Sequence, residues 1–244
     1  MRAKPLLKTL LATAFLVASA IRPAPAADSP AYVTRTPAET NLGDILQDLQ
    51  KIRSSDTHFY LLIWMPPAFW AKALQSNGEN LDSKANRKLL ALFDSYNVVV
   101  SMKTTQDIAD QDEYASQEEL RKSLRLVGDD GKGYAPLDDK RLGNEIKLIT
   151  AMLATVLRQI DEKNADQMHI LVYPGKDDGG KRFANATSDG SLRFDIDGQR
   201  FVYRLPLGSL LKPRIDPVSG ESFPGNYGYN PYTGVKLDIG PVSK

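Results

Sequence analysis

The sequence predicts a single domain of the α/β or α+β class, in which flanking helices cover a mixed and mostly buried sheet. Three observations support this fold class. The segments 58–65 and 168–173 are apolar on both faces, as strands in the middle of a covered sheet are. Apolar residues recur at helical spacing through the segment 139–162. The segment 192–205 alternates apolar and polar residues around an Asp-Gly dipeptide, the strongest two-residue signal for a β-hairpin.

The first half of the domain is expected to contain both helices and strands. Asn41 can cap a helix whose apolar residues share one face, and Pro67 suits the first turn of a short helix after a buried strand. Because a strand, helical segments and a second strand follow one another here, we expect a right-handed crossover that joins parallel strands. The expected helices cover about residues 42–53, 67–74 and 82–96, and the expected strands cover 58–65 and 97–102.

The second half is expected to complete the sheet and then to form a C-terminal β-hairpin. The polar segment 104–123 predicts a loop with one acidic helix, and the segment 124–127 predicts a third strand. The helix over 139–162 must lie on the sheet. The strand over 168–173 ends at a loop rich in Gly, Asp and Lys, and the hairpin over 192–205 follows that loop.

The N-terminus predicts a cleaved signal peptide over residues 1–26. A basic start is followed by an apolar run over 10–21 and then by small residues that end at Ala26. This run is shorter than the roughly 20 apolar residues that a membrane-spanning helix needs. We therefore expect an extended lead-in over 27–41, an α/β core domain over 42–212 and a turn-rich tail over 213–244.

Cleavage changes the charge of the chain and determines its expected location. The full sequence has 31 Lys and Arg against 30 Asp and Glu, and residues 1–26 carry four basic residues and no acidic one. The mature chain is therefore slightly acidic, which argues against a nucleic-acid partner. An exported chain without cysteine predicts a periplasmic or secreted bacterial protein, which is soluble and does not span a membrane after cleavage.

The composition excludes several classes of chemistry. With no Cys, the chain has no disulfide, thiolate metal site, iron–sulfur cluster or cysteine nucleophile. Its two His are too few for a His-rich metal centre. The sequence also lacks the Walker A, Gly-x-Gly-x-x-Gly, His-Glu-x-x-His and Gly-x-Ser-x-Gly motifs. We therefore expect neither a metal nor another cofactor.

The turn-rich tail contains a near-repeat. Asp216-Pro-Val-Ser-Gly is followed by Asn230-Pro-Tyr-Thr-Gly, and the pair resembles the two Cys-Pro-x-Cys-Gly knuckles of a zinc ribbon. The four cysteine positions hold Asp216, Ser219, Asn230 and Thr233, and zinc requires thiolate or imidazole ligands, so no zinc is expected. We favour two tight turns in which side-chain oxygens accept the backbone N–H groups that sulfur accepts in a knuckle. A calcium site at Asp216 is the less favoured alternative, because only Glu221 is near it in sequence.

The candidate binding residues lie where the central strands are expected to end. Ligands of open α/β sheets gather at that edge, which here is expected to hold residues 65–66, 103–105 and 176–181. Two aromatic residues beside the Pro66-Pro67 pair are candidates for an exposed apolar surface. The predicted ligand-binding residues are Phe69, Trp70, Lys103, Thr104, Lys176, Asp177 and Asp178.

Three further side chains have both a structural and a functional interpretation. His58 and His169 begin two expected strands, and we favour ordinary strand-edge histidines over a paired site. Glu145 falls within the apolar arc of its helix, but also in the first turns, where a carboxylate complements the helix dipole. That interpretation is favoured over a partly buried acid with a raised pKa. The sequence therefore identifies no catalytic residue and no metal ligand.

These observations favour an exported protein that binds a protein partner or an envelope component without catalysis. The alternative is a hydrolase that acts on a cell-envelope polymer through carboxylates that the sequence does not pair. Two acids in one cleft with a perturbed pKa would favour the hydrolase, and a large exposed apolar patch at Phe69 and Trp70 would favour the binding protein. The sequence leaves open whether the chain is an enzyme and what its oligomeric state is.

Overall fold

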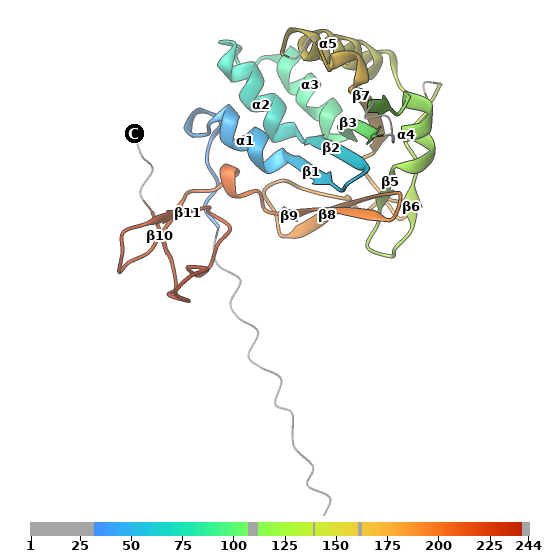
Figure 1. The fold of residues 1–244 in the computed structure, drawn as a ribbon. Helices are drawn as coiled ribbons and strands as arrows, with labels where there is room; N and C mark the ends of the chain where they lie inside the picture. The colour runs from blue at the N-terminus through green and yellow to red at the C-terminus, as the bar shows by residue number, and fades with distance from the viewer. Residues whose placement is uncertain (1–31, 107–111, 139, 161–162, 241–244) are drawn as a thin grey trace, which may run out of the picture. The chain divides into compact units, whose positions relative to one another are not determined.

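The computed structural model describes residues 32–106, 112–138, 140–160 and 163–240, and these residues confirm the mixed helix and strand content. Their regular structure consists of five α-helices and three sheets, shown in Figure 1. The expected signal peptide lies outside the described residues. In the part of the chain that is described, no helix is long and apolar enough to cross a membrane.

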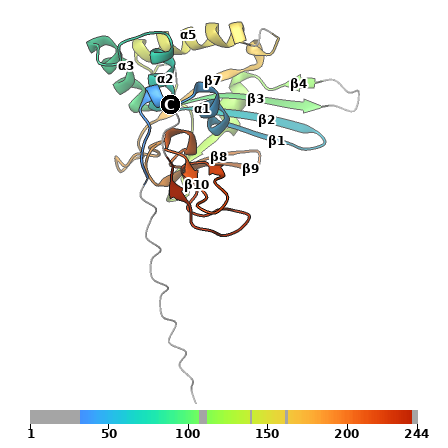
Figure 2. The ribbon, with the colours of Figure 1, turned by 90° about the vertical axis from the view of Figure 1, so that its left-hand side faces the viewer.

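The central sheet is antiparallel throughout, and its middle strand is the longest. Its strands are β1 (Gln50–Ser54), β2 (His58–Met65), β3 (Tyr96–Gln106), β4 (Asp112–Tyr114) and β7 (His169–Pro174). On one side β3 pairs with β2, which pairs with β1. On its other side β3 pairs with β7 along its first half and with β4 near its end. Figure 2 shows β1, β2 and β3 running side by side.

The antiparallel pairing shows that the expected crossover between parallel strands was wrong. Between β2 and β3 the chain forms two successive helices, α2 (Pro67–Ser76) and α3 (Lys84–Asp94). A connection of a single helix would bring the chain back to the start of β2. The observed connection has two helices, and the second one returns the chain to the end of β2. Met65 at the end of β2 is therefore in register with Val98 near the start of β3. As a consequence, neighbouring strands end at opposite edges of the sheet.

A second antiparallel sheet lies beside the central one and contains the predicted hairpin. Its strands are β5 (Arg125–Val127), β6 (Gly133–Tyr134), β8 (Gly190–Ile196) and β9 (Gln199–Leu205). Asp197 in the turn between β8 and β9 has a φ of 48°, in the left-handed region that Asp-Gly turns favour. The hydroxyl of Tyr203 donates to the carbonyl of Leu62 at 3.1 Å and so joins this sheet to β2.

Hydrophobic clusters occupy both faces of the central sheet. The first includes Trp64 and Leu171 from the central sheet together with Phe194 from the second sheet. The second lies on the other face, where Val172 packs with side chains of α2, α3 and α5 (Asn144–Ile160). Strands β2, β3 and β7 bury apolar side chains on both sides because both of their faces are covered, as the sequences of β2 and β7 predict. In Figure 1 the helices α2, α3 and α5 lie on one side of β2 and β3, with β8 and β9 on the other.

The helix boundaries agree with the local capping signals, except at the end of α1, where residues predicted to be helical join the sheet. The Oδ1 atom of Asn41 accepts the Gly43 amide at 2.7 Å and caps α1 (Leu42–Leu49), as predicted. The helix is shorter than expected because its last predicted residues form β1, whose pairing with β2 outweighs helix propensity. Glu145 is exposed in the first turn of α5 and forms an ion pair with Lys88 at 2.5 Å, which agrees with the dipole interpretation.

The tail forms the pair of tight turns that its near-repeat predicts. The Oδ1 atom of Asp216 accepts the amides of Val218 and Ser219 at 2.7 and 3.2 Å. In the second turn, the Oδ1 atom of Asn230 accepts the Tyr232 amide at 2.9 Å, and the Thr233 amide lies 3.3 Å from the same oxygen. The three short strands around these turns are β10 (Arg214–Ile215), β11 (Ser222–Phe223) and β12 (Asp238–Ile239).

A direct hydrogen bond joins the two turns where a zinc ribbon would place its metal. The Nδ2 group of Asn230 donates to Asp216 Oδ2 at 2.6 Å, and both residues are almost completely buried. The same bond and the amides of Val218 and Ser219 lower the pKa of the Asp216 carboxyl below its usual value. The carboxylate therefore satisfies donors of its own chain.

Candidate functional site

The antiparallel sheet separates residues that the sequence placed at one edge. Lys103 lies on β3 in register with Tyr60, near the start of β2. Pro174, just before the loop with Lys176, is in register with Tyr96 at the other end of β3. The seven-residue step from Tyr96 to Lys103 spans about 23 Å, at about 3.3 Å per residue. The expectation that residues 103–105 and 176–181 meet at one edge is therefore wrong, because neighbouring antiparallel strands end at opposite edges. Residues 65–66 and the loop at Lys176 follow β2 and β7, which both end beside the start of β3, so these two segments do share an edge.

Lys103 lines a polar pocket of about 330 Å³. Its Nζ atom forms an ion pair with Asp197 Oδ2 at 2.7 Å, and the Tyr60 hydroxyl lies 3.4 Å from the same oxygen. Burial of Lys103 opposes its charged form, but the hydrogen bond and charge of Asp197 outweigh this effect and raise the pKa of Lys103. His58 also lines the pocket, where its Nδ1 lies 2.8 Å from Thr57 Oγ1. A lysine held in its protonated form is a poor general base.

The other predicted polar residues belong to the sheet and to a surface loop. Thr104 is buried, with 7 % of its surface exposed, so it has little surface to offer a ligand. In the loop, Asp177 Oδ1 accepts the Lys181 amide at 2.8 Å. Asp178 forms an ion pair with Lys132, which ties the loop to the neighbouring turn. These contacts show how the loop that begins at Lys176 is held.

Phe69 and Trp70 do not form the exposed aromatic patch that the sequence suggested. Both are half-buried in α2 and pack against the hydrophobic clusters. The Trp70 ring stacks on Phe93 with 4.0 Å between ring centroids, and its Nε1 donates to the Met65 carbonyl at 3.2 Å. The expectation of an exposed patch is therefore wrong, because α2 turns these rings toward α3 and the sheet.

A pocket of about 450 Å³ lies at the edge where β2 ends and β3 begins. The Nε1 group of Trp64 donates to Asn97 Oδ1 at 3.2 Å in its wall. Arg182 also lines the pocket and forms a two-pronged ion pair with Asp94. The hydrogen bonds from Arg182 lower the pKa of the Asp94 carboxyl. This carboxylate is ionised and already bound, so it is poorly suited to act as a general acid.

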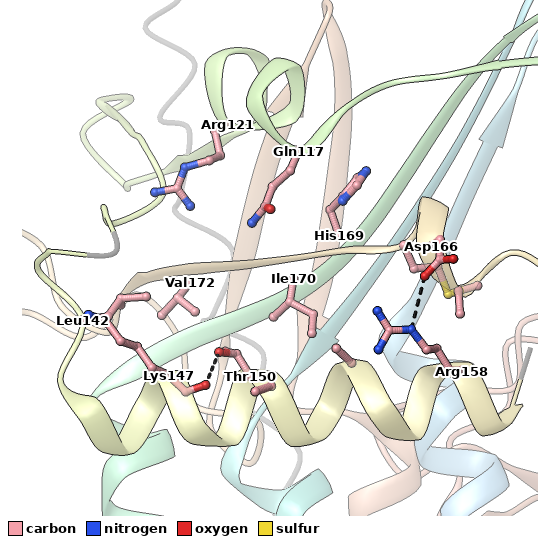
Figure 3. Close-up of a pocket in the computed structure, with 14 residues that line it drawn as sticks. Gln117, Arg121, Leu142, Lys147, Thr150, Arg158, Asp166, His169, Ile170 and Val172 are labelled. Carbon is pink, nitrogen blue, oxygen red and sulfur yellow. Dashed lines mark hydrogen bonds and ion pairs between the residues drawn. The ribbon is translucent and has the colours of Figure 1, made fainter. Parts of the chain in front are cut away.

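A hollow rich in cationic side chains lies between β7, α5 and α4 (Gln117–Ser123), with a volume of about 340 Å³. We call it the basic groove. Figure 3 shows β7 with its side chains between α4 and α5, which supply cationic groups from opposite sides. The residues of the groove that matter here are the cations Arg121, Lys147 and Arg158, the carboxylate of Asp166, and Thr150 and Ile170.

The residue spacing on α5 places two of these cations on the same side of the helix. Lys147, Ala151, Ala154 and Arg158 follow one another at steps of four, three and four residues, which share one helical face. The two alanines keep the space between the cations open. This spacing is a signal in the sequence, but the apolar residues that recur at helical spacing along the same helix obscure it.

The outer edge of β7 faces away from β3 and carries backbone groups that lack a strand partner among the described residues. The Gly175 amide donates to the Ser95 carbonyl at 3.0 Å, so the odd-numbered residues of β7 form the ladder with β3. The carbonyl of Val172 points the other way and accepts the Leu137 amide at 2.7 Å. Ile170 lies two residues earlier and shares this orientation, so its N–H and C=O face outward at the groove.

The ion pairs at the groove are weak enough for a ligand to replace them. Arg158 Nε lies 3.2 Å from Asp166 Oδ1, and Arg121 Nη2 lies 3.8 Å from Asp138 Oδ1. The two carboxylates are 75 % and 77 % exposed. Surface pairs of this kind contribute at most about 1 kcal/mol. Arg121 is also held by its own chain, because its Nη2 donates to the Leu137 carbonyl at 2.5 Å and its side chain is only 24 % exposed. Among the described residues, Lys147 forms no ion pair, so its charge is directly available to a ligand.

His169 lies at one end of the groove and is electrically neutral at physiological pH. Burial lowers the pKa of its imidazole, although a hydrogen bond with the Ala115 carbonyl, 3.1 Å from Nε2, opposes this. The sequence also raised the possibility that His58 and His169 approach one another. They are in register with Thr105 and Ser101 on opposite sides of β3, so they form no pair.

Two further carboxylates share a shallower hollow beside the groove. Glu118 and Asp138 line it, and their side chains are 76 % and 77 % exposed. The hydrogen bond and charge of Lys122 lower the pKa of Glu118. A glycosidase-type general acid needs the opposite change, a raised pKa in a sheltered site.

Comparison with known proteins does not assign the chain to a family. The chain matches no protein-family model, and neither the curated proteins nor the solved structures include a similar one. Within the described residues, no group of three or more acidic or histidine side chains is placed to hold a metal ion. The chemistry of the basic groove is therefore the main evidence for a function.

Proposed function

We propose that this protein is an exported, non-catalytic binding protein that takes an anionic ligand in the basic groove. The observation that carries the proposal is the convergence of Arg121, Lys147 and Arg158 on one hollow with a single lining carboxylate, that of Asp166. Cationic side chains from two helices attract an anion from both sides and favour its orientation along the groove.

The state of the carboxylates supports binding over hydrolysis. Asp94 and Glu118 both have lowered pKa values because Arg182 and Lys122 stabilise their ionised forms. Asp197 is held by Lys103. Hydrolysis of a polysaccharide needs one protonated carboxyl next to the bond that breaks. No observation on the described residues specifically favours the hydrolase alternative, so we keep binding as the proposal.

The proposed location is the periplasm or the outside of a bacterial cell. The N-terminal sequence, with its basic start and apolar run before Ala26, supports export. The absence of cysteine is compatible with a bacterial exported chain. In that setting the ligand would be an anionic envelope component or a protein partner with an acidic surface.

The experiment compares the affinity of the purified protein for polyphosphate and for an acidic peptide, acetyl-(Glu-Thr)₄-amide, by calorimetry at low and moderate salt. The triple variant Arg121→Gln, Lys147→Gln, Arg158→Gln should lower the affinity for at least one probe by about tenfold or more. A matched variant, Lys84→Gln, Arg87→Gln, Lys236→Gln, removes three exposed cations elsewhere and should leave the affinity unchanged.

Two results would contradict the proposal. If the native protein bound neither probe, the basic groove would not be an anion-binding site. Release of soluble fragments when the protein is incubated with purified cell-envelope polymer would show that it is a hydrolase. The second assay is scored against the same protein after heat inactivation.

A further inference from the structure

We infer that the ligand of the basic groove is an extended acidic peptide segment, which adds as a strand to the outer edge of β7. This inference rests on the proposed function and specifies the chemistry of its ligand. The edge of β7 supplies the backbone contacts, and the cations of α4 and α5 supply the preference for acidic side chains.

The backbone groups at the edge define where a peptide would pair. Ile170 directs both its N–H and its C=O outward, as the ladder of the odd-numbered residues with β3 requires. The N–H of Val172 points the same way, while its carbonyl accepts the Leu137 amide. A peptide residue opposite Ile170 can therefore exchange two hydrogen bonds with it, as in the close pair of an antiparallel ladder.

The two ends of the open edge limit the length of the segment. At one end the Leu137 amide already occupies the carbonyl of Val172. At the other end the His169 ring bonds to the Ala115 carbonyl, and the Met168 amide donates to Ala165 at 3.1 Å. About three residues of extended chain, at about 3.3 Å each, fit between these contacts.

The positions of the cations favour an acidic side chain on either face of the added strand. Side chains of a strand alternate between its two faces. Arg121 lies on the α4 side of β7, and Lys147 and Arg158 lie on the α5 side, as Figure 3 shows. With Glu at every second residue, acetyl-(Glu-Thr)₄-amide carries its carboxylates on one face of the strand, where they would meet either Arg121 or the two cations of α5 and displace Asp138 or Asp166.

A second copy of the same chain is a poorer occupant of this edge. Pairing of β7 with its own counterpart would bring Arg121, Lys147 and Arg158 of two molecules into the same groove. Like charges at such short range are unfavourable. A free anion such as polyphosphate satisfies the cations but offers no N–H groups to the Ile170 carbonyl, and this difference separates it from a peptide.

The test uses a form of acetyl-(Glu-Thr)₄-amide in which the backbone N–H groups of all eight residues are replaced by N–CH₃, so that no shift in register restores a donor. Strand addition predicts that this methylation lowers the affinity about tenfold or more, because no peptide N–H is left to donate to the Ile170 carbonyl. The carboxylates are unchanged, so binding by charge alone should tolerate the methylation much better. The peptide acetyl-(Lys-Thr)₄-amide is the charge control and should not bind.

A variant of the protein tests the same contact from the other side. Ile170→Pro removes the outward N–H but leaves the ladder of the odd-numbered residues with β3 intact, since proline is tolerated on an edge strand. The variant should lose affinity for the peptide while it keeps its affinity for polyphosphate. Thermal unfolding of the variant confirms that it is folded before either affinity is measured.

The possible outcomes separate this inference from the proposed function. If the peptide binds and neither methylation nor Ile170→Pro reduces its affinity, strand addition is wrong and anion binding by the groove stands. The same conclusion follows if polyphosphate binds and the peptide does not. If neither probe binds, both the inference and the proposed function are wrong.

Discussion

In the tail, the buried carboxylate of Asp216 accepts hydrogen bonds from three donors of its own chain, whereas the outward N–H of Ile170 at the basic groove has no partner among the described residues. Both regions place polar groups next to apolar surroundings, where unsatisfied groups are costly. The tail satisfies its groups internally and so acts as a structural unit. The groove leaves the outward backbone groups of Ile170 and the cations Lys147 and Arg158 open to solvent, where a ligand can reach them.

The same contrast explains why a resemblance to a metal-binding motif does not imply a metal site. The four positions that would be cysteine hold oxygen-bearing side chains, and Asn230 donates directly to Asp216. The turns are therefore held by hydrogen bonds that need no ion. The groove, by contrast, is marked in the sequence only by the helical spacing of Lys147 and Arg158, yet it leaves more polar groups available to a ligand.

The largest expected effect is on the tail. Asn230→Asp replaces the donor to Asp216 with a second carboxylate at a buried contact, so two like charges would face one another. We expect the amides of Val218 and Tyr232 to lose protection from hydrogen exchange by about tenfold or more at neutral pH. Thr233→Ala is the control, because its hydroxyl lies only at the edge of the turn, 3.4 Å from the Val235 amide. Equal protection in both variants would mean that the Asp216–Asn230 bond does not hold the turns.

Acid should affect the two regions in different pH windows. The pKa of Asp216 is lowered, so its stabilising contribution is present above the unfolded value of about 3.9 and is lost as the pH falls through the folded value. The pKa of His169 is also lowered, so its contribution is present above about 6.5 and is lost as the pH falls below that. Chemical shifts of the two regions, followed from pH 7 to pH 3, should change first near Ala115 and later near Val218. The reverse order would contradict the assigned contacts.

A smaller effect is expected for the pocket near the hairpin turn. Lys103→Met removes the ion pair with Asp197 and should cost about 1 kcal/mol of unfolding free energy. The side chain of Lys103 is 22 % exposed and that of Asp197 is 34 % exposed. The pKa of Lys103 is raised by Asp197, so this stability is present below the unfolded value of about 10.4 and is lost above the folded value. Lys122→Met removes a fully exposed pair with Glu118 and is expected to change nothing measurable. Urea denaturation at pH 7 should show a loss of unfolding free energy for Lys103→Met but not for Lys122→Met. At pH 11 the difference between the two variants should be smaller.

The smallest effect is expected at the tips of the tail turns. Val218 and Tyr232 are 82 % and 83 % exposed. Val218→Ser and Tyr232→Ser should change the unfolding free energy by less than about 0.5 kcal/mol, because neither side chain is packed. A larger loss in thermal or urea denaturation would show that the tips contact another part of the protein.

Local sequence signals predicted most elements of the fold but not their pairing. The hairpin around Asp197 and the tail turns at Asp216 and Asn230 were predicted because turn chemistry is encoded within a few residues. The direction of β3 relative to β2 was not, because it depends on two helices that lie between the strands. This error also separated Lys103 from the loop that begins at Lys176.

The groove was missed for a related reason. β7 is apolar on both faces, and such a sequence looks the same whether the strand is central or lies at an edge. Its open side depends on where Leu137 and Ala115 pack, and both are distant in the sequence. Arg121 comes from a different helix than Lys147 and Arg158, so periodicity along one segment cannot bring the three together.

The most direct test of the account is the hydrogen-exchange rate of the Ile170 amide in the purified protein, with and without acetyl-(Glu-Thr)₄-amide. In the free protein this amide should exchange much faster than the neighbouring Leu171 amide, which belongs to the ladder with β3. Saturating peptide should slow the Ile170 amide by about tenfold or more and leave the amides of the tail unchanged. An Ile170 amide that is already protected in the free protein, or one that the peptide leaves unchanged while it binds, would contradict an open strand edge as the binding site.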